Sequence, residues 1–221
     1  MTNGERDDGG PRRRSDGEQT HAQILDAAMR LASIEGLGSL TIGRLARELG
    51  VSKSGVFAHF RSRQRLQEET LRAAEEVFQR EVLRPGLDAP EGLARLKSLC
   101  NAYLSYVERG VFPGGCFLAQ VLAEFDAQTG PLHDAVASGH KTWLGLMEEQ
   151  VITAQRLNEL DPALHPQQFA FELWAPLELA NYLATLHRDP TITDWGREAV
   201  RATITRALPR TQVSTGVPPL A

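Results

Sequence analysis

Basic side chains concentrate in one short stretch of this sequence, residues 41–66, and their chemistry suits the phosphate groups of a nucleic acid. From Thr41 to Arg65 there are six basic residues and one acidic residue, a formal charge of +5; the whole chain is −4, so the remainder carries −9. The basic residues are Arg44, Arg47, Lys53, Arg61, Arg63 and Arg65, and the acidic one is Glu48. A basic module on an acidic body is the charge distribution expected of a protein that binds a phosphate backbone.

A first short helix is predicted to hold part of this charge. Apolar residues recur at helical spacing over two turns, at Ile42, Leu45, Ala46 and Leu49. Thr41 precedes them and can cap the unpaired amides of a helix start. Gly50 follows them and suits the left-handed residue that ends a helix.

A second short helix follows after only three residues. Ser52 is placed to cap it, and its inward residues are predicted to be Val56 and Phe60. The short connection is close to what a helix-turn-helix needs, because three residues are too few for the helices to run antiparallel. Val51 is predicted to fill the corner between the two helices.

The run from Gln23 to Leu66, about a fifth of the chain, resembles the N-terminal domain of the tetracycline-repressor (TetR) family of bacterial transcription regulators. The resemblance rests on ILDAAMRLASIEG for a first helix, LTIGRLARELGVSKSGVFAHF for the two-helix motif, and SRQRL for the start of a fourth helix. A weaker similarity to one subgroup of the family lies in FPGGCFLAQVLAEFD. The resemblance implies an operator-binding homodimer, whose C-terminal helices enclose a small-molecule pocket and pack into a dimer interface.

If the second helix docks in the major groove, Lys53, Ser54, Gly55 and Ala58 are expected to face the bases. Phosphate contacts are expected from Thr41, Arg44, Ser52, His59 and Arg63. Many family members have Tyr where this chain has Phe57, which lacks the hydroxyl that reaches a phosphate. The predicted DNA-binding residues are therefore Thr41, Arg44, Ser52, Lys53, Ser54, Gly55, Phe57, Ala58, His59 and Arg63. The competing interpretation of residues 52–60 is a plain packed helix in an interaction module.

Every periodic segment is helical and no strand-like alternation occurs, so the expected class is all-α. A three-helix helix-turn-helix domain is predicted over residues 19–66 and a larger helical domain for ligand binding and dimerisation over residues 67–208. Helices are predicted over Thr20–Glu35, Ser62–Leu83, Glu91–Arg109, Cys116–Phe125, Pro131–Leu157, Pro166–His187 and Ile192–Leu208. Residues 1–18 are predicted to be a disordered tail and residues 209–221 a loose one. Arg12–Arg14 form either a minor-groove arm or part of a solvated tail.

The later helices carry aromatic and polar residues on apolar faces. Such a stripe is either ordinary core or the lining of the pocket that the family resemblance implies. Polar groups on these faces, among them Gln120, Glu124, Glu172, Glu178 and Asn181, need partners if buried, and a ligand is one such partner. The residues predicted to bind a small, mainly apolar effector are Tyr103, Phe112, Phe117, Gln120, Glu124, Trp143, Met147, Trp174 and Asn181.

The remaining features exclude other classes. The chain has 42% hydrophobic and 24% charged residues and no run of about 18 apolar residues, as in a globular protein that does not span a membrane. No nucleophile–base pair, phosphate loop, metal-ligand spacing or dinucleotide motif is present, so no catalysis, metal or cofactor is expected. Cys116 is either a redox sensor or a small buried hydrophobe. A cytoplasmic location is expected. The alternative function is a helical-bundle enzyme or a small-molecule carrier without DNA binding.

Overall fold

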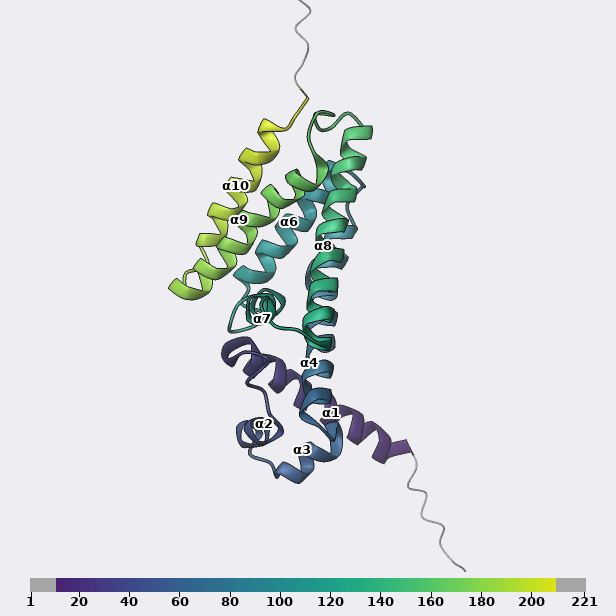
Figure 1. Ribbon diagram of the computed structural model, residues 1–221, viewed down its shortest axis with the longest axis vertical. Coiled ribbons are helices and arrows are strands. Elements are labelled where there is room, and N and C mark those ends of the chain that lie inside the picture. The colour runs from purple at the N-terminus through teal and green to yellow at the C-terminus, as the bar shows by residue number, and fades with distance from the viewer. Residues whose placement is uncertain (1–10, 210–221) are drawn as a thin grey trace, which may run out of the picture. The chain divides into compact units, whose positions relative to one another are not determined.

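The structure is a computed structural model that describes residues 11–209, with side chains described from residue 19 onward (Figure 1). The described residues contain helices and no strand, as the sequence predicts. The elements are α1 Pro11–Glu35, α2 Ile42–Leu49, α3 Lys53–Phe60, α4 Arg63–Phe78, the π-helical turn η1 Gln79–Leu83, α5 Arg84–Leu87, α6 Leu93–Glu108, α7 Phe117–Phe125, α8 Pro131–Arg156, α9 Pro166–His187 and α10 Ile192–Arg206.

The chain divides into two compact units. Unit 1 consists of Met1–Phe78 and Gly110–Val136, and unit 2 of Gln79–Arg109 and Ala137–Ala221. This division differs from the predicted domain boundary after residue 66. The C-terminal part of α4 and the whole of α7 lie in unit 1, because α7 packs on α1 and α4.

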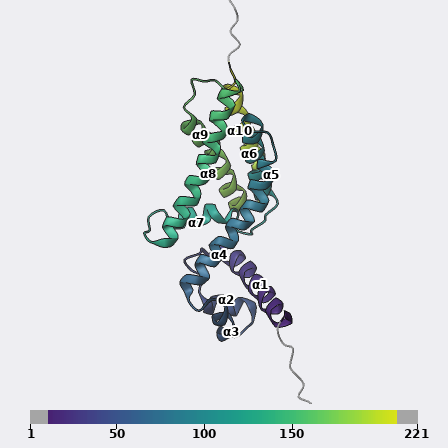
Figure 2. The same ribbon diagram turned by 90° about the vertical axis from the view of Figure 1, so that its right-hand side faces the viewer.

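In unit 1, α1 packs against α2, α4 and α7, and α2 packs against α3 (Figure 2). Both predicted caps are present: Thr41 Oγ1 accepts a hydrogen bond from the amide of Arg44, and Ser52 Oγ accepts one from the amide of Gly55. Gly50 ends α2 with φ 66°, a left-handed conformation that costs glycine little. Fully buried side chains form the core of the unit, among them Leu37, Leu40, Leu45, Val56, Phe60 and Leu66.

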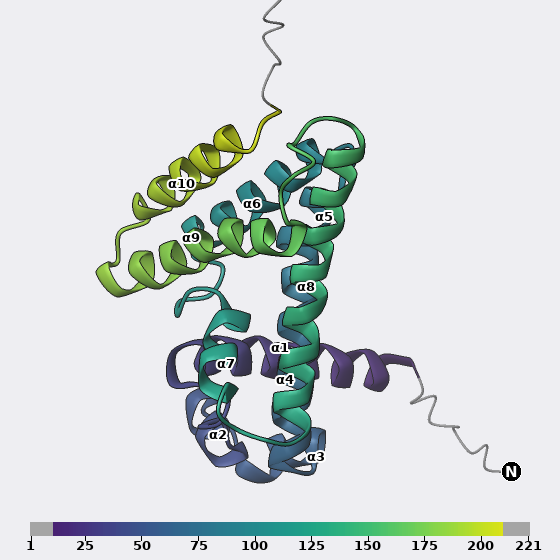
Figure 3. The ribbon, with the colours of Figure 1, turned by 45° about the horizontal axis from the view of Figure 1, so that its top comes forward.

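In unit 2, α9 and α10 lie side by side and both pack on α6 (Figures 1 and 3). Gly196 on α10 permits a close approach, since a Cβ built there would lie 3.0 Å from both Ala180 and Leu104. The buried residues include Leu96, Leu99, Leu104, Val151, Leu173 and Leu177. The apolar faces of α6, α9 and α10 therefore meet in one helical core.

Several predicted boundaries differ from the structure. Helix α1 begins at Pro11, not near Thr20, because Pro is favoured at a first helical position and the following residues need no apolar stripe to be helical. The predicted tail at residues 1–10, the side chains of Arg12–Arg14, and residues 210–221 lie outside what the structure describes.

The predicted fourth helix is divided. Helix α4 ends at Phe78, and the turn η1 follows, which the apolar pattern of so few residues cannot distinguish from an α-helix. Pro85 and Gly86, predicted to break the chain, instead lie in the short helix α5, where Pro occupies the first turn. The prediction for Val51 is also wrong: its side chain is 50% exposed, while its amide bonds the carbonyl of Ala46 at the end of α2.

Candidate DNA-binding surface and effector residues

Helix α3 presents two different faces. Val56 and Phe60 are fully buried, which confirms the predicted inward residues. The other face, which we call the recognition face, consists of the exposed residues Lys53, Ser54, Phe57 and Ala58. Phe57 is 51% exposed, so a large apolar ring points to solvent beside a lysine. Every residue of α3 that was predicted to face the bases is therefore exposed, including Gly55.

The hydroxyls expected at phosphates also stabilise the helix starts. Ser52 Oγ lies 3.1 Å from the amide nitrogen of Gly55 and 3.1 Å from Ser54 Oγ. A Cβ added at Gly55 would lie 3.2 Å from Ser52 Oγ. Close packing against this cap is therefore a structural reason for the glycine, in addition to any close approach to DNA. Thr41 Oγ1 is occupied in the same way by the amide of Arg44. As acceptors, these hydroxyls still hold a hydrogen that can be donated to a phosphate.

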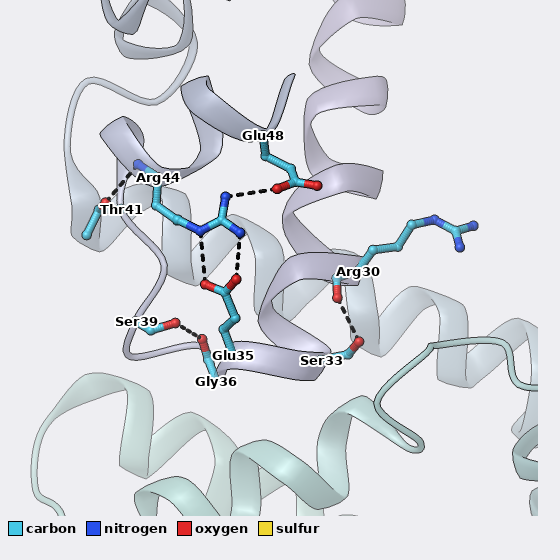
Figure 4. Close-up of polar contacts among 8 residues, drawn as sticks. All are labelled: Arg30, Ser33, Glu35, Gly36, Ser39, Thr41, Arg44 and Glu48. Atoms are coloured by element: carbon cyan, nitrogen blue, oxygen red, sulfur yellow. Dashed lines mark hydrogen bonds and ion pairs between the residues drawn. The ribbon is translucent and has the colours of Figure 1, made fainter. Parts of the chain in front are cut away.

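Arg44 is engaged by two carboxylates of its own unit. Its guanidinium donates to both oxygens of Glu35, at 2.6 and 3.1 Å, and to Glu48 at 2.9 Å (Figure 4). Hydrogen bonds to Glu35 and Glu48 raise the pKa of Arg44, and the bond to Arg44 lowers the pKa of the Glu35 carboxyl. A phosphate contact from Arg44 therefore has to compete with, or share, these surface ion pairs.

The other predicted phosphate residues lie at the start of α4 and the end of α3. The guanidinium of Arg63 is exposed and donates to the carbonyl of Gly38. The ring of His59 lies 5.6 Å from that of His21, which in turn pairs with Glu69 at 2.9 Å. Arg63 is therefore held by a loop carbonyl, and His59 packs beside another histidine ring.

The loop between α1 and α2, residues 36–40, is held by side chains from other elements. Both oxygens of Glu124 on α7 accept backbone hydrogen bonds at 2.7 Å, one from Leu37 and one from Gly38. Gln67 on α4 donates to the carbonyl of Leu37 at 2.9 Å. Glu124 was predicted to bind the effector. In the structure its carboxylate instead accepts hydrogen bonds from two loop amides.

The other unit 1 residues of the predicted effector set are packed or bonded. Phe117 is fully buried, with its ring 5.6 Å from that of Phe112, and Gln120 donates to the carbonyl of Gly114 at 3.0 Å. Gly114 itself approaches the α1 backbone at Ser33, whose hydroxyl bonds its amide at 3.3 Å. The segment FPGGCFLAQVLAEFD therefore has a structural role in unit 1.

The unit 2 residues of the set come from α6, α8 and α9. The rings of Tyr103, Trp143 and Trp174 form what we call the ring cluster: Trp174 lies 5.0 Å from Tyr103 and 5.6 Å from Trp143, both in edge-on arrangements. Met147 and Asn181 are fully buried on the same helices, α8 and α9.

Two neighbours of the ring cluster were not among the predicted effector residues. Glu178 lies one turn beyond Trp174 on α9, and the ring of His140 on α8 lies 6.0 Å from Trp174. Burial raises the pKa of Glu178, opposed by hydrogen bonds from Tyr182 and Tyr103, and burial lowers the pKa of His140. The only sequence signal for Glu178 is its position: it is a polar residue four positions after Trp174 on an apolar helix.

The cysteines and histidines show other roles. Cys100 and Cys116 are buried and form no disulfide, and burial raises the pKa of Cys100 to about 12. Cys116, at 1% exposure, is packed as a small hydrophobe. His133 pairs with Asp134 at 2.9 Å. Within residues whose side chains are described, no three His, Cys, Asp or Glu residues gather to hold a metal ion.

No helix in the described part of the chain has the length and apolar character needed to cross a membrane.

Two parts of the chain match known families. Residues 24–70 match the family described as "Bacterial regulatory proteins, tetR family", and residues 92–200 match "Tetracyclin repressor-like, C-terminal domain". Among curated relatives, the nucleoid occlusion factor SlmA of Vibrio campbellii (strain ATCC BAA-1116) is 32% identical over 88 residues, covering 39% of this chain and 45% of that protein. The match thus spans less than half the length of this relative.

Solved structures share the fold over most of the chain. A TetR transcriptional regulator from Chloroflexus aurantiacus J-10-FL has a TM-score of 0.79 and 21% identity, over 87% of this chain and 98% of that one. AibR in complex with isovaleryl coenzyme A and operator DNA has a TM-score of 0.62 and 18% identity, over 86% and 99%. Because the two family models together match residues 24–70 and 92–200, the chain belongs to the TetR family of bacterial transcription regulators.

Proposed function

We propose that the protein is a homodimeric transcriptional repressor that binds a pseudo-palindromic operator and releases it when a small, mainly apolar effector binds. The observation that carries the proposal is the recognition face: an exposed lysine, serine and phenylalanine on a capped helix whose opposite face is fully buried. Such a helix can enter the major groove without unfolding its domain. The protein acts in the cytoplasm, because that is where bacterial DNA is located.

The DNA contacts divide into base and phosphate contacts. We propose that Lys53 donates to guanine O6 and N7, and that Ser54, Gly55, Phe57 and Ala58 contact base edges. The proposed phosphate contacts come from Thr41, Arg44, Ser52, His59 and Arg63. The AibR structure, which holds operator DNA and isovaleryl coenzyme A, supports the idea that one chain of this fold takes both partners.

The dimer interface is proposed to lie on α9 and α10. Large apolar side chains are exposed there in a single chain: Phe171 57%, Leu179 57%, Leu186 73% and Trp195 66%. A patch of this kind on two neighbouring helices marks a surface that another chain covers. Two copies then present their recognition faces about one helical turn of DNA apart. Effector binding shifts the dimer toward a conformer with a different spacing.

The test of DNA binding is a gel-shift titration with the DNA that flanks the protein's own gene. Lys53→Ala should weaken binding by about 1–3 kcal/mol if Lys53 reads a base. Lys97→Ala, which removes the same charge from an exposed position in unit 2, is the matched control and should leave binding unchanged. Equal affinity for wild type and Lys53→Ala would contradict the docking of α3.

The test of the dimer is sedimentation. Leu179→Glu should give monomers, because it places a charge without a partner in the interface. Leu157→Glu is the matched control, since Leu157 is 56% exposed at the end of α8. Dimers in both variants would place the interface elsewhere.

A further inference from the structure

The carboxylate of Glu178 on α9 interacts with two tyrosine hydroxyls, those of Tyr182 and Tyr103, and one of its oxygens has no partner in the part of the chain that the structure describes. Its Oε2 lies 3.5 Å from the hydroxyl of Tyr103, at the outer limit of a hydrogen bond, and its Oε1 is buried with no partner among the described residues. The shift in its pKa comes from burial and two hydroxyls, with no contribution from a positively charged neighbour. A partly buried carboxylate without a counter-charge is costly, so a bound partner is a physical reason for its presence.

The ring cluster lies next to this carboxylate. Trp174 is one helical turn from Glu178, and its ring contacts those of Tyr103 and Trp143 at 5.0 and 5.6 Å. Helix α6 packs on α9 (Figures 1 and 3), and α8 contributes to the cluster through the contact of the Trp143 ring with that of Trp174. The faces of electron-rich rings attract cations, and indole does so most strongly.

His140 completes the surroundings without adding charge. Its Nε2 is buried with no partner in the described part of the chain, and burial lowers its pKa, which favours the neutral imidazole near pH 7. A neutral ring does not repel a cation. Trp143 and Trp174 keep 7% and 9% exposure, so a small part of the cluster reaches solvent.

We propose that Glu178 and the ring cluster bind the ammonium group of an apolar amine, with Glu178 as its counter-ion and the rings of Trp174, Tyr103 and Trp143 around its hydrocarbon part. The inference rests on the proposed function and deepens it by naming the chemical class of the effector. A neutral hydrogen-bond donor would satisfy Oε1 but leave the carboxylate without a counter-charge, whereas an ammonium ion supplies both. An anionic effector would be repelled by Glu178.

The test compares two probes of the same shape in full-length protein at pH 7. Benzylammonium carries the charge and the N–H donors, and ethylbenzene replaces its nitrogen by carbon. Binding is followed by isothermal titration calorimetry, which needs no change to the protein. The cation should bind at least about tenfold more tightly than its neutral isostere, a difference of about 1.4 kcal/mol. Equal binding, or tighter binding of the isostere, would overturn the proposal.

Variants then locate the site. Glu178→Gln keeps the shape and should weaken cation binding at least about tenfold while leaving the isostere unchanged. Glu172→Gln, an exposed position on the same helix, should bind the cation as wild type does. A second variant, Trp174→Leu, should also weaken the cation, with folding checked by circular dichroism. Wild-type cation affinity in a folded Glu178→Gln or Trp174→Leu protein would overturn the assignment.

These measurements contain no DNA, so they test the ammonium site separately from the proposal that the protein is a repressor. Ammonium binding that depends on Glu178 supports the site even if gel shifts show no operator. Specific operator binding that depends on Lys53, in a protein that shows no preference for the cation, would overturn the ammonium site and leave the repressor proposal standing.

Discussion

Glu124 on α7 and Glu178 on α9 are the same residue type on similarly apolar helices, yet the two units treat them in opposite ways. In unit 1, both oxygens of Glu124 accept backbone hydrogen bonds at 2.7 Å from Leu37 and Gly38. In unit 2, Glu178 interacts with the hydroxyls of Tyr182 and Tyr103, the latter at 3.5 Å, and its Oε1 has no partner in the described chain.

The difference separates a structural carboxylate from one available to a ligand. Glycine makes the first arrangement possible: Gly36 has φ 87°, and a Cβ built there would lie 3.0 Å from Glu124 Oε2. The loop thus approaches the carboxylate more closely than side chains would allow. Glu178 is met by neutral tyrosine hydroxyls instead, and its charge is left for another molecule to neutralise.

The largest effect is expected from Glu124→Ala. Two charge-assisted hydrogen bonds are lost and two loop amides lose their partner, so the free energy of unfolding should fall by about 3 kcal/mol. Hydrogen exchange of the Leu37 and Gly38 amides should also accelerate. Asp126→Ala, an exposed change at the end of the same helix, should stay within about 0.5 kcal/mol of wild type. Equal unfolding curves for the two variants would remove Glu124 from its structural role.

Glu178→Gln should have the opposite sign. Burial raises the pKa of Glu178 above its ordinary value of 4.5, so the folded state keeps a proton that the unfolded state releases as pH rises. Wild-type stability therefore falls with rising pH from the ordinary pKa up to the folded one. The glutamine variant lacks this loss, and its free energy of unfolding should exceed that of wild type by about 1 kcal/mol at pH 8 and match it at pH 4.

Chemical denaturation at the two pH values measures this difference. Glu75, whose pKa burial also raises, is present in both proteins and cancels from the comparison. A wild-type protein more stable than Glu178→Gln at pH 8 would show that the carboxylate is stabilised by its surroundings, which would make it resemble Glu124.

The contrast also shows what local sequence can predict. Val56 and Phe60 were identified as buried, and Thr41, Gly50 and Ser52 as caps, because each signal lies within a few residues of its partner. Helix α9 was predicted with its observed ends for the same reason, since Pro166 opens it. The helix-turn-helix and the face that α3 exposes were therefore predictable from the sequence.

The partners of the two glutamates were not accessible in this way. Glu124 bonds residues 86 and 87 positions away, and Tyr103 lies 75 positions from Glu178. No periodicity encodes such distances, so the predicted effector set mixed residues of both units. Val51 failed for a related reason: an apolar type in a turn does not reveal whether its side chain or only its amide packs inward.

A smaller effect is expected on operator affinity. The loop held by Glu124 joins α1 to α2 and includes Gly38, whose carbonyl accepts a hydrogen bond from Arg63. Loosening the loop in Glu124→Gln should therefore weaken operator binding without effector by about 1 kcal/mol, through less precise positioning of Arg63. Glu178→Gln should leave that affinity unchanged. Gel shifts in which both variants bind alike would break the proposed separation of roles.

The smallest effect is expected from Glu35→Gln, which tests a third kind of carboxylate. Glu35 is exposed and bonds the guanidinium of Arg44, an interaction that lowers the pKa of the Glu35 carboxyl. Exposed ion pairs contribute little to stability because solvent screens them, so the thermal midpoint should barely change. Operator affinity should rise by about two- to threefold at low salt, because Arg44 becomes freer to meet a phosphate and one negative charge is removed.

Glu76→Gln removes the same charge from an exposed position on α4, away from the carboxylates that bond Arg44, and it serves as the control. A gain in affinity confined to Glu35→Gln, and lost at high salt, would assign Arg44 to the DNA backbone. A loss of affinity in Glu35→Gln would mean instead that Glu35 holds Arg44 in its binding position, which would make this exposed carboxylate as structural as Glu124.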